Sequence, residues 1–168
     1  MVWTNTSFGA IKTKMNTYIW KTKEPIDTKN NKRMIGLYAG RTKHTAAHRT
    51  RGCAFSGNQW CRPIGGDEVD VIYEETISSN YRSPYGTYPR GWFKPINLTG
   101  LYEELLIQTL YRYVRNLQAH PTDVSVEVLN ANRGTKFGKW AWKDFTNKVN
   151  EGRDWNAHAL GVIKRKIK

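Results

Sequence analysis

The chain has 168 residues, enough for one domain with a substantial hydrophobic core, and carries a net charge of +13 with 7 Trp and 9 Tyr interleaved among its cations. Cations neutralise phosphates and aromatic rings stack on bases, so this composition favours a nucleic-acid partner without indicating an enzyme. No apolar run approaches the roughly 20 residues of a membrane span, and only Cys53 and Cys61 are present, which excludes a membrane-spanning protein and a disulfide-rich secreted domain. With no signal-peptide core, we expect a soluble cytoplasmic protein.

Two strands joined by a long polar connection open the predicted fold. Residues 16–21 and 34–39 have the alternating, β-branched and aromatic character of strands. They predict a hairpin that carries Tyr18 in its first strand and Tyr38 in its second. Residues 43–51 follow as a predicted short basic helix.

The second half of the chain continues with strands and helices. Residues 69–73 predict a third strand, and residues 78–97 form a long aromatic loop of a length that is usually functional. A helix with apolar residues at helical spacing follows, with Thr99 as its N-cap. Residues 124–129 then predict a strand and residues 140–149 a terminal helix before a basic tail. This order predicts a single α/β domain in which a small antiparallel three-stranded sheet is flanked by helices.

Side chains suited to phosphate chemistry lie in these elements. Tyr38 belongs to the string Leu-Tyr-Ala-Gly-Arg-Thr, Tyr18 belongs to the earlier strand, and the helix carries Glu104 twelve residues before Asn116. A phenol can take part in proton transfer, a cation can hold a phosphate, and a carboxylate can bind a divalent metal. These are the groups that phosphodiester cleavage uses.

In order and spacing, these elements resemble the GIY-YIG nuclease domain over residues 16–118. Members of that family hydrolyse DNA phosphodiesters with one divalent metal held by a glutamate. The resemblance implies that Glu104 binds Mg²⁺ or Mn²⁺, that Tyr18 and Tyr38 help to activate water, and that Asn116 is a supporting amide.

The basic residues supply the expected contacts to DNA. Arg49 is the preferred phosphate-binding cation, with Arg51, Arg41 and Arg62 as competitors, and His48 is expected to assist proton transfer. The remaining DNA contacts are expected from Arg41, Lys43, Arg51, Arg82, Arg90, Lys164, Arg165 and Lys166.

Other interpretations of the same residues remain open. The two tyrosines also suit a strand core, and Glu103 and Glu104 both suit the first turn of a helix without a metal. A zinc site is a further alternative, because two histidines one turn apart precede two cysteines. Its four residues would be His44, His48, Cys53 and Cys61.

The sequence predicts a metal-dependent endonuclease of restriction or phage type, acting on double-stranded DNA in a bacterial or phage-infected cell. A core that holds phosphate and metal carries no sequence information, so residues 78–97 and the basic extension at residues 119–168 are expected to read the duplex. Cutting both strands at one site predicts a homodimer. The competing prediction is a non-catalytic nucleic-acid-binding protein of ribosomal or virion type.

Overall fold

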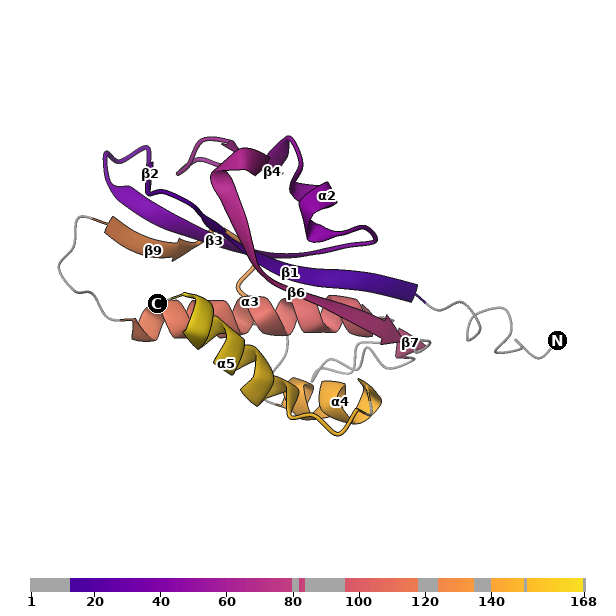
Figure 1. Cartoon of the computed structure of the whole chain (residues 1–168). Coiled ribbons are helices and arrows are strands. Elements are labelled where there is room, and N and C mark those ends of the chain that lie inside the picture. Colours follow the sequence, from indigo (N-terminus) through magenta and orange to yellow (C-terminus); the bar gives the residue numbers. More distant parts are fainter. Residues whose placement is uncertain are drawn as a thin grey trace.

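The chain adopts an α/β fold, and the computed structural model describes residues 13–79, 82–83, 96–117, 124–134, 140–149 and 151–167. Figure 1 shows α3, α4 and α5 on one side of a central sheet and α2 with β4 on the other. None of the helices in these ranges is both long and apolar enough to cross a membrane. The elements in chain order are β1 (Thr13–Thr22), β2 (Ile26–Asp27), β3 (Arg33–Thr42), α2 (Ala46–Thr50), β4 (Cys53–Phe55), β5 (Ile64–Gly65), the 3₁₀ helix η1 (Gly66–Glu68), β6 (Val69–Ser79), β7 (Arg82–Ser83), β8 (Ile96–Asn97), α3 (Leu98–Asn116), β9 (Val124–Val128), α4 (Trp140–Val149) and α5 (Trp155–Lys166).

The main sheet has the order β2-β3-β1-β6, and β9 also pairs with β3. The predicted hairpin and third strand are confirmed, because β1 pairs with both β3 and β6 in antiparallel fashion. The predicted strand at residues 124–129 is confirmed as β9, whereas the prediction of a three-stranded, antiparallel sheet is wrong. Two-residue β2 adds to the sheet, and β9 runs parallel to β3. A parallel pair forms through a distant crossover, which no local sequence signal reveals.

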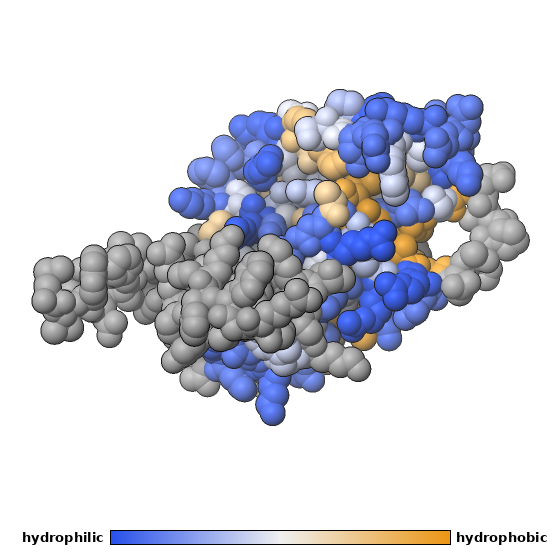
Figure 2. Space-filling model, turned by 180° about the vertical axis from the view of Figure 1, so that it is seen from behind, coloured by the Kyte–Doolittle hydropathy of each residue, from blue (hydrophilic) through white to orange (hydrophobic). Residues whose placement is uncertain are grey.

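Side chains alternate between the two faces of the sheet. Ile19 and Leu37 point to the core under α3, α4 and α5, whereas Tyr18 and Trp20 point to a second core under α2 and β5, where Ala46 is buried. On the surface, hydrophilic residues border a hydrophobic band, as seen from behind in Figure 2. β1 and β3, which carry the two tyrosines, therefore pack against α3, α4 and α5 on one face and against α2 and β5 on the other.

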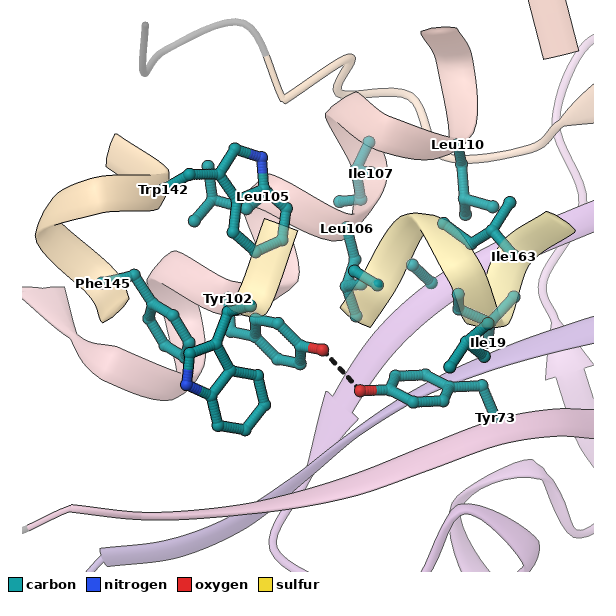
Figure 3. Close-up of a cluster of buried hydrophobic side chains, with 14 of the residues drawn as sticks. Ile19, Tyr73, Tyr102, Leu105, Leu106, Ile107, Leu110, Trp142, Phe145 and Ile163 are labelled. Carbon is teal, nitrogen blue, oxygen red and sulfur yellow. Dashed lines mark hydrogen bonds between the residues drawn. The ribbon is translucent and has the colours of Figure 1, made fainter. Parts of the chain in front are cut away.

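Aromatic packing joins α3, α4 and α5 below the sheet. The fully buried Tyr102 stacks on Phe145 at 4.9 Å between ring centroids and meets Trp155 edge-on at 5.3 Å. Its hydroxyl forms a hydrogen bond with the hydroxyl of Tyr73, which ties α3 to β6 (Figure 3). Burial raises the pKa of both phenols, so they remain protonated and serve packing.

Two helix boundaries differ from the prediction. Thr99 is not an N-cap, because α3 begins at Leu98. The prediction of a basic tail at residues 164–166 is also wrong, because these residues form the last turn of α5. The Asp154 carboxylate caps this helix by accepting a hydrogen bond from the Ala157 amide at 3.1 Å. Trp155 is buried at the start of α5, so this part of the extension belongs to the core.

Candidate functional site

A pocket of about 410 Å³ lies at the edge of β3, beyond the point where β9 stops pairing with it. The last backbone pair joins β3 at Leu37, which accepts a hydrogen bond from the Leu129 amide at 2.7 Å. The Asn130 side chain then imitates one more strand residue. Its Nδ2 donates to the Ala39 carbonyl at 2.8 Å, and its Oδ1 accepts from the Ala39 amide at 3.0 Å. Tyr38, between Leu37 and Ala39, is the residue of β3 that lines the pocket.

Tyr18 and Tyr38 come from neighbouring strands and lie on the same face of the sheet. Tyr18 is only 3% exposed and covers Gly40, whereas Tyr38 is half-buried, stacks on Trp20 at 5.3 Å and lines the pocket. Burial, assisted by the neighbouring Tyr38, raises the pKa of Tyr18 to about 12. Burial also raises the pKa of Tyr38. Both phenols are therefore protonated at neutral pH and can donate hydrogen bonds.

Gly40 provides the space that Tyr18 occupies. A Cβ at this position would lie 2.5 Å from the Tyr18 hydroxyl oxygen. We expect Gly40→Ala to lower the free energy of unfolding by about 1–3 kcal/mol, because the buried ring has little room to move. Urea denaturation followed by circular dichroism measures this change. Gly161→Ala in α5 is the control, because its Cβ would meet nothing closer than 3.5 Å. An unchanged unfolding energy for Gly40→Ala would contradict the assigned packing.

Arg49 is the cation next to the two tyrosines. It lies in α2, whose N-cap Thr45 accepts a hydrogen bond from the His48 amide at 3.1 Å. The Arg49 side chain is exposed, and its charge lowers the pKa of both Tyr18 and Tyr38 against the effect of burial. The charge of Arg49 therefore acts on both tyrosines, and its role as the phosphate-binding cation stays a prediction.

Glu103 is the acidic residue among those that line the pocket. Its carboxylate lines the pocket, lies 3.7 Å from Nε of Arg41 and raises the pKa of Tyr38. Burial raises the pKa of Glu103 itself, and the Arg41 charge opposes this rise. The structure therefore places Glu103, and not the predicted metal ligand Glu104, at the pocket beside Tyr38.

Glu104 has a different environment. Its Oε1 accepts a hydrogen bond from Nδ2 of Asn132 at 2.5 Å. Its Oε2 is buried and has no hydrogen-bond partner among the residues that the structure describes. Successive helical residues point about 100° apart, and Glu103, but not Glu104, is among the residues that line the pocket. Glu104 instead faces the segment after β9.

The histidines and cysteines do not join this group. The His44 and His48 rings lie 4.4 Å apart beside a separate pocket of about 490 Å³, which Lys43 also lines. Cys53 is exposed and Cys61 is buried, and both thiols are free. Within the described ranges, no three His, Cys, Asp or Glu side chains are arranged to hold a metal ion. The four residues of the alternative zinc site are thus not gathered, and His48 is not in the tyrosine pocket.

The other predicted residues lie elsewhere. Asn116 is the last residue of α3, about 20 Å along the helix axis from Glu103, so it does not reach the pocket. Arg51 is exposed just after α2, and Arg62 is paired with Glu68 at 2.6 Å. Arg90 and the side chain of Arg82 fall outside the described residues. The exposed cations at the end of α5 are Lys164, Arg165 and Lys166.

Comparison with protein-family models, with curated proteins and with solved structures finds no match to this chain. What this region can do therefore follows from the side chains in the pocket and beside it. Tyr38 and Glu103, which line the pocket, can orient water and bind a divalent cation, and the exposed Arg49 guanidinium can hold a phosphate. Glu103, Asn130 and Asn132 are the parts of this region that the sequence did not indicate.

Proposed function

We propose that the protein is a divalent-metal-dependent DNA endonuclease of the GIY-YIG type, and that the pocket lined by Tyr38 and Glu103 is its active site. The observation that supports this is that Tyr38 and Glu103 line one pocket, and that the charges of Glu103 and Arg49 act on the pKa of both Tyr18 and Tyr38. Their order along the chain is that of the nuclease resemblance, with Glu103 in place of Glu104. A net charge of +13 supplies the affinity for a polyanion.

The residues fit a magnesium or manganese ion. Mg²⁺ is usually bound by one or two carboxylates, several waters and the phosphates of its substrate, rather than by an all-protein cage. The Glu103 side chain is 22% exposed at the pocket, so its carboxylate is accessible to such a hydrated ion. When bound, the metal supplies electrostatic stabilisation of the phosphate undergoing attack.

The protein side chains have separate roles in this proposal. Tyr38, at the pocket, orients the attacking water by hydrogen bonding, and the buried Tyr18 supports it from below. Tyr18 does not serve as a phenolate base at neutral pH, because its pKa is about 12. Arg49 donates hydrogen bonds to the phosphate and stabilises its developing negative charge. Arg41 favours the ionised form of Glu103.

Incubation of supercoiled plasmid with the purified protein tests the proposed activity. Nicking is expected in Mg²⁺ and not in EDTA, because the carboxylate alone cannot stabilise an anionic phosphate. DNA binding with no nicking in either condition would favour the non-catalytic nucleic-acid-binding protein.

The pair of Arg41 and Glu103 predicts a shift in the pH dependence of cleavage. Only the ionised carboxylate binds metal, so cleavage falls as the pH drops through the pKa of Glu103. Arg41→Gln removes the charge that lowers this pKa. We therefore expect the acidic limb of the rate profile to move to higher pH, measured at subsaturating Mg²⁺. Arg62→Gln is the control, since Arg62 pairs with Glu68, and an identical shift in it would contradict the assignment.

The basic end of α5 is a proposed binding surface for the DNA backbone. Deleting this end would remove buried core residues, so charge substitution is the sharper test. We expect the combined substitutions Lys164→Gln, Arg165→Gln and Lys166→Gln to flatten the dependence of log K on log salt, by about 0.9 for each phosphate that the variant no longer neutralises. Fluorescence anisotropy at several salt concentrations measures the slope, and thermal denaturation checks the fold. An unchanged slope would show that this end of α5 faces away from DNA.

Site-specific cutting remains part of the proposal. One pocket acts on one phosphodiester, so cleavage of both strands at a defined site is proposed to use two copies of the chain on the duplex. The predicted reading loop at residues 78–97 falls largely outside the described residues.

A further inference from the structure

A larger pocket adjoins the candidate active site. It has a volume of about 640 Å³ and shares four lining residues with the active-site pocket. The shared residues are Asn58, Leu129, Asn130 and Ala131. The two pockets are therefore neighbours that share part of their walls.

Trp60 lines this second pocket and is 62% exposed, the most exposed large hydrophobic side chain among the described residues. Its backbone is held on both sides. The Trp60 amide donates to Oδ1 of Asn58 at 2.8 Å, and its carbonyl accepts from the Lys29 amide at 2.9 Å. An exposed indole on a backbone held in this way offers a flat surface without the entropy cost of ordering a loop, as a stacking platform requires.

Cations border the indole. Lys32 and Arg133 line the pocket, where Glu127 is the only acidic side chain among the residues that form it. The Arg133 guanidinium lies over the Tyr111 ring at 5.6 Å from its centroid. Nζ of Lys29 donates to the Asn58 carbonyl at 2.8 Å, which adds a third cation near the tryptophan. Positive charge beside an exposed ring suits a nucleic-acid strand, with phosphates on the cations and a base on the ring.

We infer that the pocket of Trp60, Lys32 and Arg133 binds an unpaired nucleotide of the DNA strand whose phosphate occupies the active site. The inference rests on the proposed nuclease function and specifies its substrate. Inside a duplex, both faces of a base are covered by its neighbours, so an indole stacks most readily on a base at a single-stranded end, a junction or a flipped position. The enzyme therefore prefers DNA that has an unpaired segment next to a duplex.

Binding measured in EDTA separates this inference from catalysis. The probes are a fluorescein-labelled duplex with a short single-stranded overhang and the blunt duplex of the same sequence. In a second overhang probe, 2-aminopurine replaces one unpaired base, because its fluorescence is quenched by stacking. The variants are Trp60→Ala, Trp60→Phe and the control Trp140→Ala, which removes a 39% exposed tryptophan from α4.

We expect wild-type protein to bind the overhang more tightly than the blunt duplex and to quench 2-aminopurine. Trp60→Ala should weaken overhang binding about 10-fold and abolish quenching, while blunt-duplex binding stays within about two-fold. Trp60→Phe should keep most of the affinity, and Trp140→Ala should behave as wild type.

Two results would overturn the inference. One is an equal loss of affinity for both probes in Trp60→Ala, and the other is no loss for either. Wild-type protein that binds and nicks DNA without preferring the overhang would refute the unpaired-nucleotide site and leave the nuclease function standing. Wild-type protein that binds neither probe would refute both.

Discussion

Replacing Glu103 with glutamine is expected to lower the rate of plasmid nicking at least about 100-fold, because the amide cannot bind Mg²⁺ as the carboxylate does. Glutamine preserves the size of the side chain at the pocket. DNA affinity in EDTA should remain within about two-fold, since many cations share the binding of the phosphates. Single-turnover nicking and fluorescence anisotropy measure the two quantities on the same preparation.

Glu104→Gln is the matched control, because it changes the same atoms one residue further along α3. Its carboxylate is held by Asn132 and does not line the pocket. We expect nicking by this variant to stay within about ten-fold of wild type, a loss much smaller than removal of a metal ligand. If Glu104→Gln abolished nicking and Glu103→Gln did not, the metal ligand would be Glu104, as the spacing to Asn116 implies.

Arg49→Ala is expected to lower nicking about 100-fold, the usual effect of removing one donor that stabilises charge in the transition state. Arg49→Lys should recover part of the rate, because it restores the charge without the two-pronged geometry of a guanidinium. The rates are compared at saturating protein so that weaker binding does not contribute.

Arg51→Ala is the control for the general effect of losing one cation near α2. Arg51 is exposed two residues after Arg49, but the arginine whose charge lowers the pKa of both tyrosines is Arg49. Only a modest loss is expected for Arg51→Ala, and it should disappear at saturating protein. Equal losses in the two variants would mean that both arginines act through general attraction to DNA.

Much of the sheet could be predicted from the sequence, because Tyr18 and Tyr38 lie in strands with strong local patterns. A basic segment directly after the second strand also indicated Arg49, whose charge acts on both tyrosines in the structure. These features depend on short-range spacing and on the fixed alternation of side chains in a strand. The tyrosine and arginine part of the candidate site could therefore be predicted from sequence.

The choice between Glu103 and Glu104 depends on how α3 is rotated against the sheet. Both glutamates are partly buried, and they flank the same apolar face, so the helical pattern alone does not decide which one reaches the pocket. The pairing of the Asn130 side chain with β3 could not be predicted from the sequence either. Its side chain completes an edge of β3 that is 91 residues away in sequence, and an isolated asparagine carries no signal for such pairing.

The end of the chain shows the opposite case, in which a signal was present. Asp154 has the character of a helix N-cap, and Trp155, Ala159 and Ile163 follow it at the apolar spacing of a helix. These three apolar residues are buried in α5. The positive run that follows favoured the interpretation of a solvated tail. Cations in the last turn of a helix instead interact favourably with its dipole.

A preformed complex offers the sharpest comparison between catalysis and simple binding. Protein in excess is mixed with supercoiled plasmid in EDTA, binding is verified by gel shift, and excess Mg²⁺ is then added. If the Tyr38 and Glu103 pocket is a metal-dependent nuclease site, nicked circles will accumulate after the addition in wild type and not in Glu103→Gln. A wild-type complex that remains bound and intact in Mg²⁺ and in Mn²⁺ would contradict the nuclease and identify the protein as a non-catalytic partner of nucleic acid.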